Sequence, residues 1–231
     1  MDKIKTGCKS IDEMLNGGIE RGCITEIYGE AGSGKTNICL STAINVAKGE
    51  EFVIYIDTEG VSMERFSQLG GDEEIAKKIL FYKAYKFSHQ TEIIERAVNL
   101  IEKRGDISLL IVDSMTEFYR AERGVEEDIS SKRRSSLAWQ LSLLNSVARK
   151  KNVAVLITNQ VYLDTATKEI KPIGGHTLHH NAKAILFLRK IGNGYREAVL
   201  MKHRSLPEGL VARFEIRNDG LYPVEVDKNG S

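Results

Sequence analysis

Residues 29–36 read Gly29-Glu30-Ala31-Gly32-Ser33-Gly34-Lys35-Thr36, which is the G-x-x-x-x-G-K-T form of a loop that binds phosphate groups. Glycines allow consecutive backbone N–H groups to turn toward one anion. Lys35 is placed to reach the β- and γ-phosphates of a nucleotide, and the Thr36 hydroxyl is placed to bind Mg²⁺. The sequence therefore predicts that residues 29–36, followed by Asn37, bind a nucleoside triphosphate together with Mg²⁺.

The sequence on either side of this loop predicts the strand and the helix that such a loop needs. Ile24–Tyr28 is a short β-prone run, and Asn37–Ala47 carries apolar residues at helical spacing without proline. A helix that starts at the loop directs its N-terminal partial positive charge toward bound phosphates. A chance match to the motif would lack this context, so we interpret the loop as a nucleotide site.

Length and composition indicate one domain. The chain has 231 residues, enough to bury a large core, and no linker rich in proline, glycine or serine interrupts it. We therefore expect residues 1–231 to form a single domain. The formal net charge is only +1, so overall charge does not attract a polyanion, and any contact with nucleic acid depends on a local basic cluster.

Cysteine spacing and hydropathy exclude two further classes of protein. Cys8, Cys23 and Cys39 are odd in number and have no C-x-x-C spacing, which argues against a disulfide framework and against a thiolate metal site. The sequence has neither an apolar N-terminal signal region nor an apolar run of about eighteen residues. We expect a soluble, cytoplasmic protein with reduced thiols.

Short apolar runs alternate with helical patterns along most of the chain. The predicted strands after the phosphate loop are Phe52–Ile56, Leu80–Tyr82, Leu109–Val112 and Val153–Ile157, and the clearest helices are Thr91–Lys103 and Ser136–Lys151. This alternation predicts an α/β fold with a mostly parallel sheet flanked by helices. In such a fold the ligand site lies at the carboxyl ends of the strands.

The sequence after residue 190 predicts antiparallel strands at the C-terminal end of the sheet. Gly192-Asn193-Gly194 is a hairpin signal between Ile185–Arg189 and Tyr195–Met201. A second pair, Val211–Ile216 and Leu221–Val226, is joined at Asn218-Asp219-Gly220. We therefore expect a parallel sheet extended by hairpins.

Polar side chains follow the predicted strands and suit nucleotide hydrolysis. Asp113 closes an apolar strand, where a carboxylate binds Mg²⁺ directly or through water. Glu59 lies two residues beyond its strand, where it would polarise the water that attacks the γ-phosphate; the alternative is a solvated loop acid. Gln160 would sense the γ-phosphate, and the alternative is an amide that caps the backbone.

Two later segments are candidates for contact with nucleic acid. The first lies between Asp113 and the helix at Ser136, opens with Phe118 and Tyr119, and contains the basic residues Arg120, Arg123, Lys132, Arg133 and Arg134. Basic residues with aromatic ones suit a phosphodiester backbone, although the acids mixed among them leave a solvated charged loop as the alternative. The second is the polar stretch Val161–Ile173, and a loop of this length is usually either functional or disordered.

Three histidines follow this loop, at 176, 179 and 180. Residues 176 and 180 have the i, i+4 spacing that brings two metal ligands together on a helix. We do not interpret them as a metal site, because no cysteine or acid nearby supplies a third ligand.

The order of these motifs resembles the core of the RecA/RadA recombinase family, and the resemblance covers nearly the whole chain. The matching stretches are Thr6–Asp12, Leu15–Ile19, the phosphate loop, Ile56–Gly60, Leu110–Ser114, Thr158–Val161 and Pro172–His176. Several motifs in the same order are more specific than a phosphate loop alone. The resemblance implies a RecA-like P-loop ATPase core that takes ATP with Mg²⁺.

The resemblance also implies roles for individual residues. It makes Glu59 the water-activating glutamate, Asp113 the aspartate on the Mg²⁺ side and Gln160 the γ-phosphate sensor, with Lys35 assisting catalysis. Arg65, in Met63-Glu64-Arg65-Phe66, matches the arginine that packs on the adenine ring.

Two departures narrow the resemblance to the short archaeal paralogues of RadA. The N-terminal DNA-binding domain and the linker motif that builds filaments are not found in the sequence, and Val161–Ile173 is short for a DNA-contacting loop. The second departure is Lys202-His203-Arg204, where RadA has a different stretch that contains an acidic residue. In a self-associated protein these residues would reach a neighbour's γ-phosphate, and otherwise they would contact DNA or remain surface charge.

The resemblance therefore implies an accessory protein of homologous recombination and DNA repair. It would bind ATP and DNA, preferentially single-stranded, hydrolyse ATP weakly, and assist the RadA recombinase and other recombination proteins, with self-association left open. One alternative is an interaction module switched by the nucleotide without meaningful hydrolysis. Another is a signalling ATPase of the same superfamily, which the Lys-x-Arg element at 202–204 favours.

Overall fold

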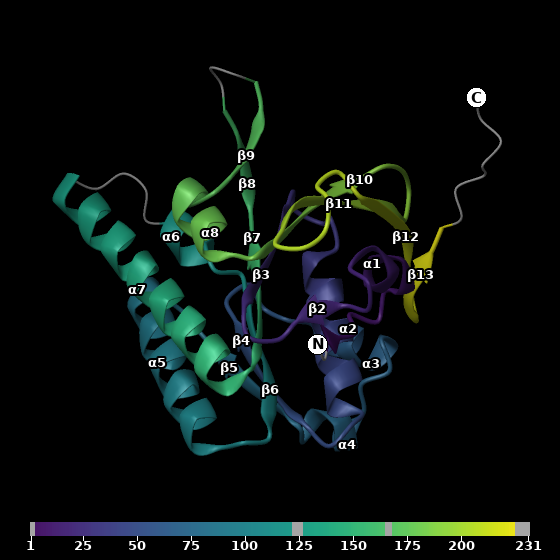
Figure 1. Ribbon diagram of the computed structural model, residues 1–231, viewed down its shortest axis with the longest axis horizontal. Coiled ribbons are helices and arrows are strands. Elements are labelled where there is room, and N and C mark those ends of the chain that lie inside the picture. Colours follow the sequence, from purple (N-terminus) through teal and green to yellow (C-terminus); the bar gives the residue numbers. More distant parts are fainter. Residues whose placement is uncertain (1–2, 122–126, 165–167, 225–231) are drawn as a thin grey trace.

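A nine-stranded sheet runs through the centre of the computed structural model, which describes residues 3–121, 127–164 and 168–224 (Figure 1). Across the sheet, the strands are β13 (Gly220–Pro223), β12 (Val211–Arg217), β11 (Tyr195–His203), β10 (Ala184–Lys190), β3 (Ile24–Gly29), β7 (Ala154–Asn159), β6 (Ile107–Asp113), β4 (Phe52–Asp57) and β5 (Ile79–Lys83). The strands from β10 to β5 are parallel, and β11, β12 and β13 are added antiparallel. The predicted fold class is confirmed.

Helices cover both faces of the parallel part of the sheet (Figure 1). One core contains side chains of α1 (Lys9–Met14), α2 (Lys35–Ala47), α3 (Met63–Gln68) and α4 (Glu73–Ala76). The other contains side chains of α5 (Phe87–Lys103), α7 (Glu127–Lys151) and α8 (Gly175–Asn181), with α6 (Glu117–Ala121) beside it.

Strand side chains supply the middle of both cores because successive residues point to opposite faces. In β4, Tyr55 packs into the first core while Ile54 and Ile56 pack into the second, and all three are fully buried. A strand covered on both faces reads as a continuous apolar run, which is the pattern that predicted these strands.

Helix α7 is the largest difference from the predicted elements. It begins at Glu127, whereas the sequence pattern predicts a helix from Ser136. Residues 127–135 contain neither proline nor glycine, so the helix continues through them although their charge hides the apolar period. The basic residues Lys132, Arg133 and Arg134 therefore lie on a helix and not in a loop. Helix α5 likewise begins at Phe87, four residues before the predicted start.

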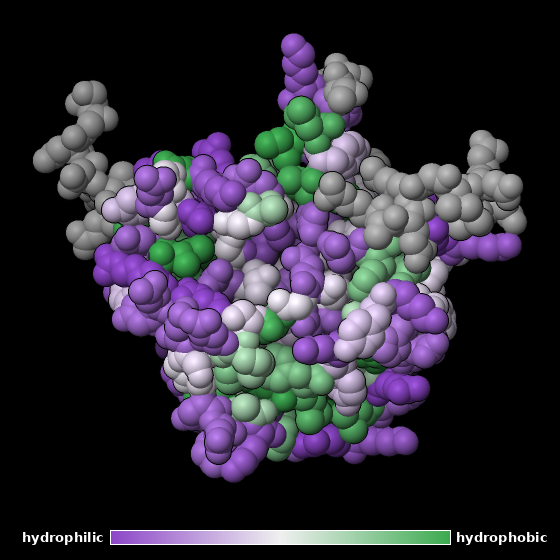
Figure 2. All heavy atoms as spheres, turned by 180° about the vertical axis from the view of Figure 1, so that it is seen from behind, coloured by the Kyte–Doolittle hydropathy of each residue, from purple (hydrophilic) through white to green (hydrophobic). Residues whose placement is uncertain are grey.

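Two small antiparallel ribbons lie outside the main sheet. Near the N-terminus, β1 (Lys3–Ile4) pairs with β2 (Ile19–Glu20). The predicted loop 161–173 begins and ends in the second ribbon, where β8 (Val161–Leu163) pairs with β9 (Ile170–Pro172). This ribbon projects from the body of the protein (Figure 1), and Figure 2 shows hydrophobic side chains on it. Leu163 is 61% exposed and Ile170 54%.

None of the helices in the described ranges combines the length and the apolar character that a membrane crossing requires.

Candidate nucleotide-binding site

The phosphate loop joins β3 to α2, as the sequence predicts. Close packing requires a glycine at position 29, and backbone conformation requires one at position 34. A Cβ on Gly29 would lie 2.3 Å from the carbonyl oxygen of Leu188, and a Cβ on Gly34 would lie 2.8 Å from Cδ1 of Ile216. Gly34 also has a φ of 106°, which side chains disfavour. The loop is therefore held against β10 and β12 with its backbone fixed in shape.

Lys35 is buried at the start of α2 and turns back over the loop. Its Nζ donates to the carbonyl oxygens of Gly29 (2.9 Å) and Glu30 (3.0 Å). Burial lowers the pKa of Lys35, while the carboxylates of Glu59 and Asp113 raise it. An ammonium group held among carbonyl oxygens and carboxylates at a helix N-terminus is a site prepared for an anion or a metal–anion complex.

The hydroxyl of Ser33 supports the same interpretation. It is fully buried inside the loop, and within the described residues its oxygen has no hydrogen-bond partner. A hydroxyl in this position is available to donate to an anion bound by the loop. The loop therefore fits a bound polyphosphate.

Asp113 ends β6 as a buried carboxylate with a defined set of partners. Its oxygens accept hydrogen bonds from the Tyr55 hydroxyl (2.8 Å) and the Thr158 hydroxyl (2.5 Å). Burial raises the pKa of Asp113, and hydrogen bonds from Thr158, Tyr55 and Thr36 lower it. Thr36 and Asp113 are thus brought together beside Lys35. A hydroxyl and a carboxylate are the oxygen ligands that Mg²⁺ takes in proteins, so this pair fits the metal.

Glu59 lies in an exposed loop whose shape is fixed by the preceding strand. The carboxylate of Asp57, at the end of β4, accepts hydrogen bonds from the backbone N–H groups of Glu59 (3.1 Å), Gly60 (2.8 Å) and Val61 (2.8 Å). An aspartate that caps several consecutive N–H groups holds a tight turn. Glu59 is therefore presented at the carboxyl end of β4 by a rigid support.

Gln160 connects Glu59 to a second acid. Its Nε2 donates to Oε1 of Glu59 and to Oε2 of Glu117, at 2.8 Å in each case. The structure thus brings Gln160 and Glu59 together, at the ends of β7 and β4. The sequence pattern places Glu117 only among the acids of a charged loop and does not assign it to this site. In the sequence, the one indication that Glu117 lies near the site is its position four residues after Asp113. In the structure it is the first residue of α6.

Arg65 and Asn37 also lie together, at the other side of the phosphate loop. The Arg65 Nε donates to Oδ1 of Asn37 (2.6 Å), and its terminal nitrogens donate to the carbonyl oxygens of Asn218 (2.6 Å) and Arg217 (2.9 Å). Burial lowers the pKa of Arg65. Arg65 therefore joins α2 and α3 to the turn between β12 and β13.

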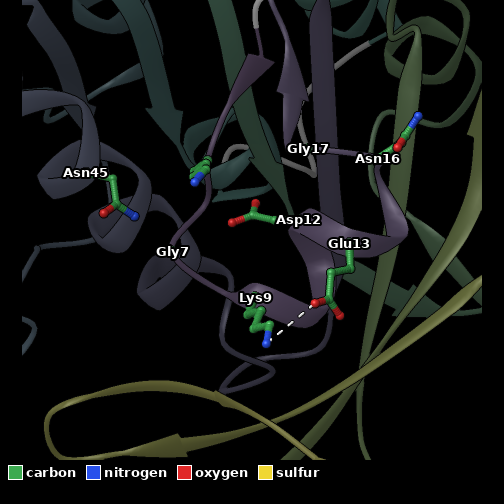
Figure 3. Close-up of a pocket in the computed structure, with 8 residues that line it drawn as sticks. Gly7, Lys9, Asp12, Glu13, Asn16, Gly17 and Asn45 are labelled. Atoms are coloured by element: carbon green, nitrogen blue, oxygen red, sulfur yellow. Dashed lines mark ion pairs between the residues drawn. The ribbon is translucent and has the colours of Figure 1, made fainter.

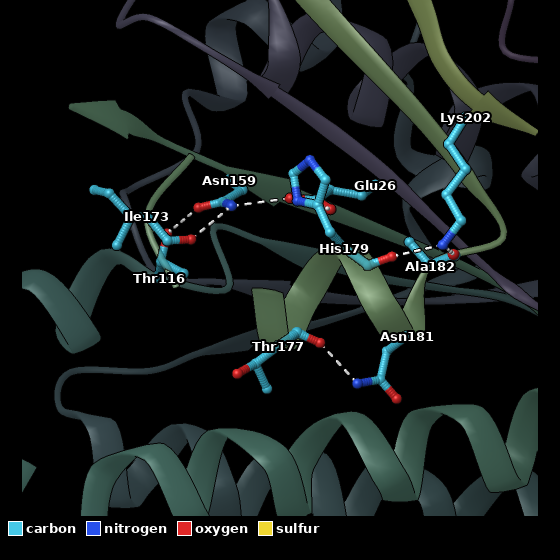
Figure 4. A network of polar contacts seen from close by, with 9 residues as sticks. All are labelled: Glu26, Thr116, Asn159, Ile173, Thr177, His179, Asn181, Ala182 and Lys202. Atoms are coloured by element: carbon cyan, nitrogen blue, oxygen red, sulfur yellow. Dashed lines mark hydrogen bonds and ion pairs between the residues drawn. The ribbon is translucent and has the colours of Figure 1, made fainter. Parts of the chain in front are cut away.

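A buried polar network lies behind Gln160 and was not found from the sequence (Figure 4). The Asn159 amide donates to Oε1 of Glu26 and to the carbonyl oxygen of Ile173, both at 2.9 Å, and its Oδ1 accepts from Thr116 at 2.6 Å. The Ile173 N–H then bonds to the carbonyl oxygen of Gln160 at 2.9 Å. Asn159 therefore fixes the base of the β8–β9 ribbon next to Gln160.

Glu26 is the charged member of this network. It is fully buried on β3, three residues before the phosphate loop, and Nδ1 of His179 lies 3.6 Å from its Oε2. Burial raises its pKa to about 7, although the hydrogen bond from Asn159 and the charge of Lys202 lower it. The folded protein therefore holds the Glu26 proton more tightly than the unfolded chain does.

This pKa makes the stability of the fold decrease with pH. Because the folded state binds the extra proton between pH 4.5 and about 7, the free energy of unfolding falls as the pH rises through that range. Glutamine does not titrate, so we expect the free energy of unfolding of Glu26→Gln to fall by about 3 kcal/mol less over this range than that of the unaltered protein. This figure takes about 1.4 kcal/mol for each unit by which the pKa is raised. Urea unfolding at pH 5 and pH 8 measures it. Glu64→Gln, at an exposed glutamate of α3, should leave the difference between the two pH values as in the unaltered protein.

The three basic residues at 202–204 contact groups of their own chain. Lys202 Nζ donates to the carbonyl oxygens of His179 (2.7 Å) and Ala182 (2.9 Å), at the end of α8 (Figure 4). Arg204 Nε lies 2.6 Å from Oε2 of Glu20, and Nδ1 of His203 accepts from the backbone N–H of Ser205 at 3.1 Å. The structure does not bring them to the phosphate loop of the same chain.

The predicted DNA-contacting residues lie apart from this site. Lys132 and Arg134 are exposed on the first turns of α7, and Arg133 is half-buried. Arg120 lies in α6, and Arg123 lies outside the described residues. A hollow of about 460 Å³ separates the N-terminal ends of α5 and α7 and is lined in part by Lys132 and Arg133.

Another hollow does not belong to the site. It measures about 600 Å³, lies beside α1, and is lined by polar residues including Lys9, Asp12 and Glu13 (Figure 3). Asp12 is used structurally, since its Oδ1 accepts from the backbone N–H of Thr6 at 2.7 Å. The described ranges also hold no group of three or more His, Cys, Asp or Glu residues that suits a metal ion.

Comparison with known proteins gives the family. The Rad51 family model matches residues 1–224. The DNA repair and recombination protein RadB of Methanococcoides burtonii is 43% identical over 222 residues, which cover 95% of this chain and 97% of that protein. The RadB protein of Thermoplasma acidophilum is 42% identical over 219 residues, which cover 95% of this chain and 93% of that protein.

A solved structure agrees with the sequence matches. The crystal structure of the RadB recombinase has a TM-score of 0.80 and 36% identity to this protein, and the match covers 96% of this chain and 100% of that one. The resemblance to the RecA/RadA recombinases, and to their short archaeal paralogues, is thereby confirmed. The chain therefore belongs to the Rad51 family, and within it to the group of RadB proteins.

Proposed function

We propose that the protein binds ATP with Mg²⁺, hydrolyses it slowly, and binds single-stranded DNA as an accessory factor in recombination and repair. The observation that carries the nucleotide part is the convergence of Lys35, Thr36, Asp113, Glu59 and Gln160 around one glycine-rich loop. The recombination part rests on the relatives, which are named DNA repair and recombination proteins. We infer that the RadA recombinase is the partner that it assists.

The chain's own residues would divide the work at the phosphates. Lys35 would leave its two carbonyl partners for the β- and γ-phosphates, and the buried Ser33 hydroxyl would gain a partner. Thr36 and Asp113 would hold Mg²⁺, which when bound neutralises charge on the phosphate oxygens. Arg65, already held in place by Asn37, would pack against the adenine ring.

Glu59 would orient the attacking water and accept its proton. Its backbone is held by Asp57 and its side chain by Gln160, so the carboxylate needs little reorganisation. Slow turnover is expected because stabilisation of developing charge is usually the largest catalytic term. Lys202 and Arg204, which would supply such charge to a neighbouring molecule, bond within their own chain.

The steady-state rate of ATP hydrolysis, measured with Mg²⁺ and with or without single-stranded DNA, tests this proposal. Lys35→Ala serves as the blank. Turnover above the blank supports an ATPase, and stimulation by DNA supports a link between the DNA-contacting segments and Glu59. A rate equal to the blank contradicts the hydrolytic part.

One observation favours a second candidate, a nucleotide-switched interaction module. Gln160 bonds to Glu59 and is also fixed to the base of the β8–β9 ribbon, so a nucleotide that moves Gln160 would move a projecting surface. In that case Lys35→Ala abolishes the change in partner affinity, whereas Glu59→Gln leaves it intact. Equal loss in both variants would exclude the module.

The basic end of α7 is the proposed contact with DNA. We expect the triple change Lys132→Glu, Arg133→Glu and Arg134→Glu to weaken binding of single-stranded DNA at least about tenfold, because each residue neutralises a phosphate. The slope of log K against log salt should become shallower by about 2 units, at about 0.7 for each lost contact. Fluorescence anisotropy with a labelled oligonucleotide at several salt concentrations measures both quantities.

The same helix offers a matched control. Arg149, Lys150 and Lys151 lie in its last turn, so their reversal to glutamate changes the net charge equally at the opposite end. Unchanged affinity in the first triple variant, or equal weakening in both, would move the DNA contact to another segment, either the β8–β9 ribbon or residues 202–204.

A further inference from the structure

Two like charges face each other where the β10–β11 hairpin passes the phosphate loop. Lys190, the last residue of β10, is the cross-strand partner of Arg196 in β11. Like charges directly opposite one another destabilise an antiparallel pair. A negative charge, either from the protein or from a ligand, would relieve this repulsion.

Both side chains lie at the phosphate loop of the same chain. A Cβ on Gly32 would lie 3.3 Å from Nζ of Lys190 and 3.4 Å from its Cε, so the ammonium group sits over the loop backbone. One terminal nitrogen of Arg196 donates to the carbonyl oxygen of Gly32 at 3.1 Å. The parallel pairing of β10 with β3, in which Leu188 lies opposite Gly29, fixes this approach.

Acidic residues on these strands are engaged by other arginines. Glu197 accepts hydrogen bonds from Arg189 (2.7 Å) and Arg213 (2.8 Å), and Glu215 accepts from Arg217 (2.7 Å). Within residues 3–121, 127–164 and 168–224, no acidic side chain forms an ion pair with Lys190 or Arg196.

Lys190 and Arg196 are therefore two cations at the loop that form no ion pair with an acidic side chain of the described residues. Lys35, at the start of α2, is a third cation of the loop, and the carboxylates of Glu59 and Asp113 act on it. The buried Ser33 hydroxyl in the same loop lacks a partner among the described residues. Phosphate groups bound to the loop would bring negative charge to these cations.

We propose that Lys190 is a second phosphate-binding cation of the nucleotide site, acting within its own chain alongside Lys35. This inference rests on the proposed binding of ATP and deepens it, because it names a residue of the C-terminal hairpin as part of the site. Arg196 holds the Gly32 carbonyl and so keeps the loop beside Lys190. Residues 202–204 would bring positive charge to the phosphates bound by a neighbouring molecule, whereas Lys190 would bring it to the phosphates bound by its own chain.

The test is the dissociation constant of Mg·ATP and, without a base or sugar, of tripolyphosphate. Lys190→Ala should weaken both about three- to tenfold, Lys190→Glu should weaken them more than about tenfold, and Lys190→Arg should stay within about twofold of the unaltered protein. Replacing Lys190 by alanine or glutamate also removes the like charge opposite Arg196, so these variants should be at least as stable to heat as the unaltered protein, and a loss of affinity would not reflect unfolding. The loss should shrink in high salt, because an exposed cation is screened.

Lys48→Glu is the matched control, since Lys48 is exposed at the opposite end of α2 from the loop. If the unaltered protein binds Mg·ATP and Lys190→Glu binds it as tightly as Lys48→Glu does, the inference is overturned while the proposed function stands. If the unaltered protein binds neither Mg·ATP nor tripolyphosphate, the proposed function fails and the inference fails with it.

Discussion

Lys35→Ala is expected to weaken binding of Mg·ATP at least about 100-fold, the largest change in affinity for any single substitution at this site. Charge-assisted hydrogen bonds from an ammonium group to phosphate are about twice as strong as neutral ones, and Lys35 would make them to two phosphates. A loss of about 3 kcal/mol corresponds to a factor of somewhat more than 100. Titration with a fluorescent ATP analogue, with unlabelled ATP as competitor, measures the constant.

The surroundings of Lys35 explain why its loss is not compensated. Its ammonium group is already buried and has a lowered pKa, so the cost of removing it from water is met when the protein folds and not when the nucleotide binds. Alanine would leave the carboxylates of Glu59 and Asp113 without this cation near the incoming phosphates. Repulsion from the two acids should then add to the lost attraction.

Two controls separate this effect from unfolding. Lys48→Ala makes the same chemical change at the far end of α2 and should bind Mg·ATP as the unaltered protein does. Because Lys35 also bonds to the Gly29 and Glu30 carbonyls, thermal unfolding of Lys35→Ala must show an intact fold. A folded Lys35→Ala protein whose affinity stays within a few fold of normal would show that the loop does not bind the polyphosphate as proposed.

Much of this fold is readable from the sequence for a physical reason. A parallel strand buried on both faces must be apolar along its length, so β4, β6 and β7 each stand out as uninterrupted runs. The same property locates the site, because the first polar residue after such a run marks the carboxyl end of the strand. Asp113 follows the apolar run of β6 directly, and Glu59 lies two residues beyond Asp57, the first polar residue after the run of β4.

The contacts of Asp113 and Glu59 could not be predicted from the sequence, because they depend on the register between strands that are distant in sequence. Tyr55 and Thr158 reach Asp113 from β4 and β7, which pack on either side of β6. Tyr55 looked like any other buried aromatic residue of a strand. Which strands become neighbours in a sheet depends on the tertiary fold, and β4, β6 and β7 are distant in sequence.

Charge patterns alone left the roles of the basic residues open. The sequence shows that residues 202–204 are basic, but not that Lys202 bonds to the end of α8 or that Arg204 pairs with Glu20. It gave no special weight to Lys190 and Arg196, which the β10–β11 register places at the loop. A basic residue indicates a binding site for an anion only when the structure shows whether acidic side chains of the protein neutralise it.

Glu59→Gln is expected to lower the rate of ATP hydrolysis about 100-fold while the affinity for Mg·ATP stays within a few fold of normal. General base catalysis contributes about 10²- to 10⁴-fold, and glutamine has nearly the same shape as glutamate but cannot accept the proton. The substitution leaves the turn intact, since Asp57 bonds to the backbone of residues 59–61 and not to the side chain. Single-turnover hydrolysis of labelled ATP is sensitive enough for a slow enzyme.

Glu117→Gln is the matched control because Gln160 donates to Glu117 and Glu59 at the same 2.8 Å. Both variants lose one negative charge beside the same amide, so any effect of charge or of the Gln160 contact should appear in both. A loss confined to Glu59→Gln assigns the proton transfer to Glu59. Equal losses would instead mean that the two acids act by holding Gln160. If the unaltered protein itself does not hydrolyse ATP, the hydrolytic role of Glu59 is excluded, and the nucleotide would act only as a switch, through Gln160, on the β8–β9 ribbon.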